Sequence, residues 1–162
     1  MEYLKIKRLK ENAVIPKRAT SGSAGVDLYA CTDEPITVNS GDLVKIPTGI
    51  AIELPNENTA AFVFARSGLG IKHGIAPSNA VGVVDSDYRG EICVGLTNHG
   101  KEPFVIEPQT RIAQLIVMPV LPLPIVEVEE LSGTERGENG FGSSGTRSVS
   151  YTHLTLPTNR EV

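Results

Sequence analysis

The chain has no tryptophan and few aromatic residues of any kind, since phenylalanine and tyrosine together make up 5% of its 162 residues. Long uninterrupted segments are also missing, because 16 glycines and 11 prolines divide the chain. Helical bundles and coiled coils need long periodic segments, so both fold classes are disfavoured. No apolar run approaches the roughly 18 residues that a membrane-spanning helix requires. At this length we expect a single domain with its own core.

An excess of positive charge is missing as well. Lys and Arg number 15 against 19 Asp and Glu, which gives a formal net charge of −4. Duplex-binding proteins usually carry a basic surface, so we expect no nucleic-acid partner, and a phosphate ligand would need a few well-placed groups. The N-terminal MEYLKIKRLKEN lacks the apolar core of a signal peptide or anchor. We therefore expect a soluble, cytoplasmic protein without a membrane partner.

Cysteine and histidine are too few and too scattered for a disulfide framework or a zinc site. The two cysteines, Cys31 and Cys93, fit buried thiols in a reducing compartment better than a bridge. The three histidines stand apart along the chain and the two cysteines are far from each other, so the spacing of a zinc site is absent. Neither GxxxxGK[ST] nor a GxGxxG after a strand occurs, so P-loop and Rossmann chemistry are not indicated.

What the sequence does contain is a series of short alternating segments separated by turn residues. In residues 91–97, Ile92, Val94 and Leu96 share one face. Short strands at this spacing predict an antiparallel sandwich or barrel. Only residues 67–73 are predicted to form a helical turn, which their glycines keep short. The other predicted strands are residues 3–7, 43–46, 49–54, 60–64, 81–84, 111–120 and 125–128.

The composition changes after Leu131. Residues 132–145 are mostly Gly, Ser and Glu with a single aromatic residue, which predicts a mobile arm rather than a core element. Residues 147–162 have no period and no recognisable motif, and we interpret them as a non-native or disordered tail. The expected organisation is a β domain at 1–131, an arm at 132–146 and a tail at 147–162.

Two turns combine glycine with polar side chains that could bind or transform a phosphate ester. In ARSGLG at 65–70, Arg66 and Ser67 follow an apolar strand, where a guanidinium and backbone N–H groups can bind phosphate. A helix start with a solvated arginine explains that segment equally simply. In GVVDSDYRG at 82–90, Asp85 ends an apolar strand and suits a general base. An ordinary hairpin remains the alternative, since Asp, Ser and Gly are common turn residues.

Three further segments place polar residues in unusual surroundings. Asp27 lies inside the apolar, strand-like SAGVDLYA and needs a partner, either an arginine such as Arg111 or a hydrated metal. Gln114 in the apolar RIAQL must bond to the backbone or to a ligand. The segment RGENGFGSSG at 136–145 fits a flexible linker, but its central Phe141 and its hydroxyl groups also suit a lid.

Together and in this order, the five segments resemble the motifs of the homotrimeric dUTP diphosphatase (dUTPase) family. One motif alone would be weak, whereas five in order are highly specific. The resemblance covers nearly all of residues 1–146. It implies an all-β, jelly-roll or β-barrel-like domain of the dUTPase β-clip type that forms a homotrimer with a flexible C-terminal arm. It also implies hydrolysis of dUTP to dUMP and pyrophosphate with Mg²⁺, which keeps uracil out of DNA and supplies dUMP for thymidylate synthesis.

The resemblance implies a role for each matched residue. Asp85 would activate a water for attack on the α-phosphorus, and Tyr88 would pack on the deoxyribose. Mg²⁺ would have no direct protein ligand, with Asp27 acting through metal-bound water. The remaining implied substrate-binding residues are Arg66, Ser67 and Gly68 for the phosphates, Gln114 for the α-phosphate region, Asn79 with the backbone near Val83, Val84 and Cys93 for the uracil edge, and Arg136, Phe141, Gly142, Ser143 and Ser144 for the lid.

The match to the family is not complete, and two alternatives stay open. Asn139 stands where the family usually has glycine and Ser144 where threonine is common, although we expect the arm to close. An enzyme related to dCTP deaminase would share the fold class but carry a different catalytic signature. A nucleotide-binding regulatory protein on the same scaffold is the alternative outside enzymes, and the retained Asp85 and Tyr88 argue against it.

Overall fold

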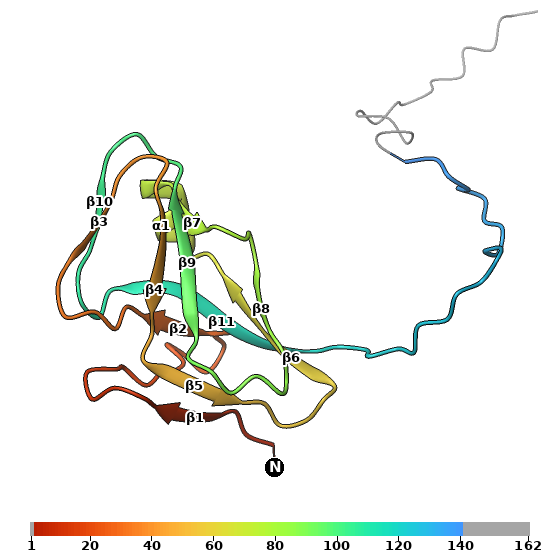
Figure 1. Cartoon of the computed structure of the whole chain (residues 1–162), viewed down its shortest axis with the longest axis horizontal. Helices are drawn as coiled ribbons and strands as arrows, with labels where there is room; N and C mark the ends of the chain where they lie inside the picture. Colours follow the sequence, from red (N-terminus) through yellow and green to blue (C-terminus); the bar gives the residue numbers. More distant parts are fainter. Residues whose placement is uncertain (1, 141–162) are drawn as a thin grey trace, which may run out of the picture. The chain divides into compact units, whose positions relative to one another are not determined.

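Eleven strands and one short helix make up the part of the chain that this computed structural model describes, residues 2–140 (Figure 1). This is the all-β class that the sequence predicts. The elements are β1 (Lys5–Arg8), β2 (Val26–Tyr29), β3 (Ile36–Val38), β4 (Leu43–Pro47), β5 (Ile50–Glu53), β6 (Thr59–Phe64), α1 (Ser67–His73), β7 (Ile75–Pro77), β8 (Gly82–Val84), β9 (Cys93–Asn98), β10 (Phe104–Ile106) and β11 (Arg111–Pro119).

The described strands form small antiparallel sheets around one core, as expected for a barrel-like domain. The two larger sheets have the orders β2-β11-β6-β8 and β4-β9-β7, and the pairs β1-β5 and β10-β3 complete the set. Buried aliphatic side chains from both larger sheets meet in this core, including Leu28 of β2, Ile112 of β11 and Leu96 of β9. Burial of these apolar surfaces is the main driving force for the fold.

Strand β9 illustrates how the alternating pattern positions the site. Val94 and Leu96 face the core with 2% and 0% exposure, and Ile92 just before the strand is equally buried at 2%. The residues between them, Cys93 and Gly95, lie on the opposite face and are half-buried. Because side chains alternate along a strand, the same pattern that fixes the core directs this second face outward.

Helix α1 occupies the residues predicted for it and ends at a glycine. Gly74 has φ 70° and ψ 14°, and its N–H bonds to the carbonyl of Gly70. A Cβ at this position would also lie 2.4 Å from the backbone nitrogen of Gly100, so both the conformation and the space require glycine. Leu69 is the buried residue that anchors the helix.

The predicted strand at 125–128 is wrong. Residues 124–140 belong to a second unit that begins at Pro124, and they form no helix or strand. Ile125 is fully exposed. The alternating residues there find no neighbouring strand among the described residues, and a strand needs a partner for its N–H and C=O groups. Conversely, β3, β7 and β10 were not predicted, since three residues are too few to establish a period.

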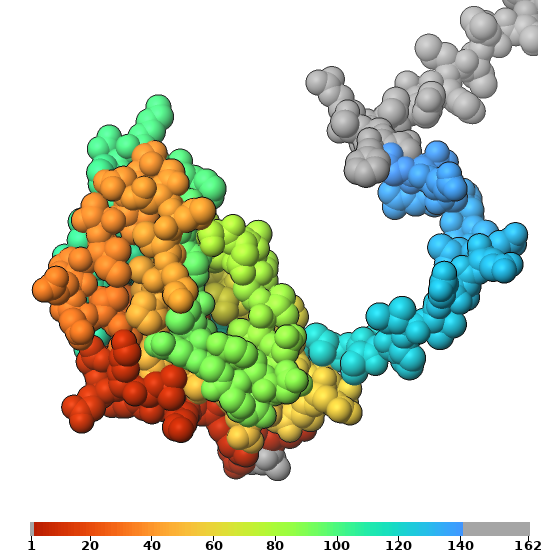
Figure 2. Space-filling model, in the orientation of Figure 1, coloured from red at the N-terminus to blue at the C-terminus, as the bar shows by residue number. Residues whose placement is uncertain are grey.

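The first unit, which ends at Leu123, presents several segments on the face shown in Figure 2. The N-terminal residues (red), the region of β3 and β4 (orange) and the region of β8 and β9 (green) share this face. Among the described residues, no helix has the length and apolar character needed to cross a membrane.

Candidate functional site

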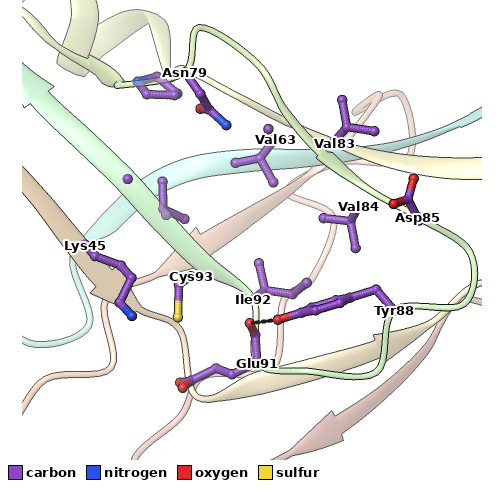
Figure 3. A pocket seen from close by; sticks show the side chains of 14 residues that line it. Lys45, Val63, Asn79, Val83, Val84, Asp85, Tyr88, Glu91, Ile92 and Cys93 are labelled. Atoms are coloured by element: carbon purple, nitrogen blue, oxygen red, sulfur yellow. Dashed lines mark hydrogen bonds between the residues drawn. The ribbon is translucent and has the colours of Figure 1, made fainter.

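A cavity of about 370 Å³ lies between β8 and β9 and the loop that joins them (Figure 3). Strands β4, β6 and β7 contribute one lining residue each. Its size falls in the range of small-molecule sites, which usually run from about 300 to 1,000 Å³. Six residues predicted for the site line it: Asn79, Val83, Val84, Asp85, Tyr88 and Cys93.

Asp85 follows the end of β8 at the rim of this cavity. Its side chain is exposed and makes no hydrogen bond or ion pair with any residue between 2 and 140. The loop is held instead by other groups, because the N–H of Tyr88 bonds to the carbonyl of Asp85 at 3.2 Å. Arg89 Nη1 also donates to the carbonyl of Ser86 at 2.7 Å. A strand end and a self-supporting loop thus hold the backbone of Asp85, and its carboxylate oxygens are free to contact a ligand or water.

Tyr88 folds back over the loop at the cavity wall. Its hydroxyl donates to the carbonyl of Glu91 at 3.0 Å, the dashed line in Figure 3. A Cβ at Gly90 would come within 2.3 Å of the Tyr88 hydroxyl oxygen, so glycine makes room for this position of the ring. The side chain remains 46% exposed. An oriented aromatic surface of this kind can pack against the apolar side of a sugar.

Asn79 lies across the cavity from Tyr88, in the turn between β7 and β8 (Figure 3). The turn is tight: the N–H of Val81 bonds to the carbonyl of Asn79 at 2.7 Å. Ala80 has φ 62°, a left-handed conformation that costs a non-glycine residue energy and often occurs at functional sites. The Asn79 carboxamide makes no hydrogen bond with other described residues, so its donor and acceptor are both available to a ligand.

A second polar cluster lies where β2, β6 and β11 meet. Asp27 accepts hydrogen bonds from Arg66 Nε at 2.8 Å and from Arg111 Nη1 at 3.3 Å. The pairing of Asp27 with an arginine such as Arg111 is therefore confirmed, and Arg66 joins it. Gln114, opposite Asp27 in the β2–β11 ladder, donates from Nε2 to the carbonyl of Ala65 at 2.8 Å. Gln114 was expected to bond either to the backbone or to a ligand, and its amide nitrogen bonds to the backbone.

The other predicted site residues are spread over three places. Ser67 and Gly68 are exposed at the start of α1, directly after Arg66. Arg136 lies in the second unit, where its Nε donates to the carbonyl of Asn139 at 2.9 Å. Asparagine at position 139, where the family usually has glycine, is not strained, because Asn139 is not among the residues with positive φ. The predicted lid residues Phe141, Gly142, Ser143 and Ser144 lie outside the described residues.

Two charged residues that line the cavity were missed by the sequence analysis, Lys45 and Glu91. Glu91 Oε1 accepts a hydrogen bond from the N–H of Gly49 at 2.8 Å, which ties the loop to the turn before β5. Burial raises the pKa of the Cys93 thiol, and the nearby Glu91 carboxylate raises it further. Lys45 has no local sequence feature that points to the cavity, because the pairing of β4 with β9 brings it there. Glu91 directly follows the loop at 85–90 and carried no predicted role.

Three comparisons with known proteins bear on this site. The family model described as dUTPase matches residues 11–145. A protein of Desulfitobacterium hafniense named deoxyuridine 5'-triphosphate nucleotidohydrolase is 53% identical over 131 residues, covering 81% of this chain and 87% of its own. One of the same name from Coxiella burnetii is 52% identical over 139 residues, covering 86% and 91%.

Solved structures show the same similarity. The dUTPase of Staphylococcus bacteriophage 80alpha, solved with dUPNHPP, superimposes with a TM-score of 0.81 at 27% identity. The match covers 89% of this chain and 99% of the phage protein.

Proposed function

This chain belongs to the dUTPase family and is an enzyme that hydrolyses dUTP, and we propose that Asp85 is the base that activates the attacking water. One observation carries the proposal: the Asp85 carboxylate lies at the rim of the cavity with no partner among residues 2–140. Its oxygens are therefore available to a water molecule in the cavity. General-base assistance of this kind contributes about 10²–10⁴ in rate.

In the proposed reaction, a water attacks the α-phosphorus of dUTP and transfers a proton to Asp85. The new P–O bond forms as the bond from the α-phosphorus to the α,β-bridging oxygen breaks. That oxygen leaves with pyrophosphate, and dUMP remains. The related phage dUTPase, solved with the dUTP analogue dUPNHPP, supports dUTP as the substrate.

The cavity suits a pyrimidine nucleoside in one orientation. The sugar packs on the ring of Tyr88 beside Asp85, and the base extends toward Asn79 between β8 and β9. There the Asn79 carboxamide and the backbone near Val83, Val84 and Cys93 form hydrogen bonds with the uracil edge. Sites that recognise a base edge by hydrogen bonds leave unpaired groups when the wrong base binds, and they can discriminate by about 10⁴-fold.

The phosphates are bound by Arg66, Ser67 and Gly68, with Gln114 near the α-phosphate. Residues 2–140 contain no group of three His, Cys, Asp or Glu side chains that could enclose a metal ion. In the proposal, Mg²⁺ would be held by phosphate oxygens and water rather than directly by a protein side chain, while both oxygens of Asp27 accept hydrogen bonds from arginine. The lone pairs that remain on Asp27 can hold metal-bound water. Bound in this way, Mg²⁺ neutralises charge on the triphosphate.

A complete site requires more than one copy of the chain in this proposal. None of the described phosphate-binding residues lines the cavity that would hold the nucleoside. A homotrimer would complete each site with the phosphate-binding residues of a neighbouring copy. The arm with Arg136, Phe141, Gly142, Ser143 and Ser144 would then close over it. We propose the cytoplasm as the place of action, because free Cys31 and Cys93 fit a reducing compartment.

Hydrolysis of dUTP in water enriched in ¹⁸O tests the reaction. The proposal predicts one ¹⁸O atom in dUMP and none in pyrophosphate, as measured by mass spectrometry of both products. Label in pyrophosphate would show attack on the β-phosphorus and would overturn the proposed attack on the α-phosphorus. Repeating the reaction with EDTA in place of Mg²⁺ tests the metal, and an unchanged rate would contradict its role.

A further inference from the structure

Lys45 is a cation in the cavity wall that none of the five motifs contains. It lies on β4 opposite Gly95 of β9, and Pro47 of β4 pairs with Cys93. Side chains two residues apart on a strand share a face, so Lys45 and Cys93 lie on the same face of the sheet. Both line the cavity. The register of β4 against β9 therefore brings the Lys45 ammonium group to the cavity wall formed by β9.

The residue opposite Lys45 in the ladder is Gly95, so no β9 side chain lies directly across from the lysine. Ser78 Oγ lies 2.6 Å from the place where a Cβ of Gly95 would be. The ammonium also makes no hydrogen bond or ion pair with any residue between 2 and 140. Its three donors are free for a ligand.

Charge in this part of the cavity acts on the neighbouring thiol. The positive charge of Lys45 lowers the pKa of Cys93, against the larger opposite effect of burial and the effect of Glu91. Lys45 is therefore near enough to influence a half-buried group of the wall.

In Figure 3, Lys45 lies beside Cys93 on the side of the cavity formed by β4 and β9, whereas Asp85 and Tyr88 lie on the side of β8 and the loop after it. This inference rests on the proposed function, in which the sugar packs on Tyr88. In a pyrimidine nucleoside, O2 is next to the nitrogen that carries the sugar, whereas the group on C4 is on the far side of the ring. A base attached to a sugar at Tyr88 therefore directs its C4 substituent toward Lys45.

We propose that Lys45 donates a hydrogen bond to O4 of uracil and so helps to exclude cytosine. Uracil has a carbonyl acceptor at C4, and a lysine ammonium has only donors. Cytosine has an amino group there, so donors of the base and of the cation would face each other. A hydrogen bond involving a charged group strengthens binding by about 10- to 100-fold. The matching loss for cytosine adds to the selectivity of the backbone contacts.

Lys45→Met tests this in the full-length enzyme, because methionine keeps the apolar stem and removes the donors. Expected are a fall of about tenfold in kcat/KM for dUTP and no fall for dCTP, with Lys45→Arg restoring most of the loss. Lys101→Met is the matched control, since Lys101 is exposed and does not line the cavity. Equal losses for dUTP and dCTP would show a structural role and overturn the inference.

Thio-substituted nucleotides identify the atom. Sulfur is a weaker acceptor than oxygen, so 4-thio-dUTP should be a poorer substrate than dUTP for the wild type. In Lys45→Met this penalty should shrink about tenfold, whereas the effect of 2-thio-dUTP should be the same in both enzymes. A penalty at position 2 that depends on Lys45 would overturn the assignment to O4.

The outcomes separate this inference from the proposed function. If the wild type hydrolyses dUTP and Asp85→Asn does not, while Lys45→Met matches Lys101→Met with every nucleotide, only the role of Lys45 is wrong. If the wild type fails to release pyrophosphate from dUTP, the proposed function itself is wrong.

Discussion

The cavity between β8 and β9 and the Asp27 cluster, both in the first unit, differ in whether their polar side chains have hydrogen-bond partners. In the cavity between β8 and β9, Asp85 and Asn79 have side chains with no hydrogen-bond partner among the described residues. In the cluster at β2, β6 and β11, both oxygens of Asp27 bond to arginines. Buried polar groups must be paired, whereas groups at an open rim can wait for a ligand. Under the proposed function, the unpaired groups of the cavity contact the substrate, whereas the ion pairs of Asp27 also stabilise the fold.

The largest effect is expected from Asp85→Asn. We expect kcat for dUTP to fall by about 10²–10⁴, because the amide cannot take the proton from water. Binding of dUMP by calorimetry should be nearly unchanged. The free energy of unfolding should shift by less than about 0.5 kcal/mol, since the carboxylate has no described partner to lose. Glu57→Gln, an exposed charge away from the cavity, is the control, and near wild-type turnover by Asp85→Asn would refute the base assignment.

The next test asks whether one active site combines the cavity of one subunit with the phosphate-binding residues, such as Arg66, of another subunit. Asp85→Asn and Arg66→Ala should each be nearly inactive as pure proteins. If sites combine two chains, subunits mixed by refolding in equal amounts should recover about a quarter of wild-type activity, because one site in four receives both intact halves. Activity that stays at the sum of the two pure variants would show that each chain supplies both halves itself.

Asp27→Asn is expected to have a smaller effect, and to lower the free energy of unfolding rather than to affect proton transfer to Asp85. Removing the carboxylate leaves Arg66 and Arg111 facing each other without their shared partner. The free energy of unfolding should fall by about 1–2 kcal/mol in urea titrations, more than for a solvent-exposed pair. A value as small as that expected for Asp85→Asn would remove the contrast between the two groups.

The smallest effect belongs to the exposed pair of Lys5 and Glu53, which serves as the reference for Asp27. Lys5 Nζ lies 2.5 Å from Glu53 Oε1, and its hydrogen bond lowers the pKa of Glu53. A lowered pKa contributes stability above the ordinary pKa of the carboxyl, and this is lost as the pH falls through the folded-state pKa. Glu53→Gln should therefore matter slightly at neutral pH and not at all in acid. A loss of unfolding free energy in Glu53→Gln as large as that in Asp27→Asn would contradict the expected order of the two ion pairs.

Much of the fold could be predicted because local rules decide it. For the cavity, local features indicated Asp85, whereas the resemblance to the dUTPase family supplied the roles of the other predicted residues. Alternation placed Val94 and Leu96 in the core, and the glycines around α1 limited the helix to residues 67–73. The strand predicted at 125–128 failed because alternation alone does not supply a neighbour. Lys45 was missed because its place in the cavity depends on register, opposite a glycine fifty residues further along the chain. Long-range pairing of this kind leaves no pattern in the sequence around Lys45.

Pyrophosphate release from dUTP, dCTP, dTTP and UTP, measured on the full chain with Mg²⁺, tests the central claim most directly. If the cavity between β8 and β9 selects the nucleotide and Asp85 activates the water, kcat/KM for dUTP should exceed that for each other nucleotide by at least about 10²-fold. The advantage of dUTP over dCTP should be the one that Lys45→Met reduces. Comparable release from dCTP, or none from dUTP, would contradict the account.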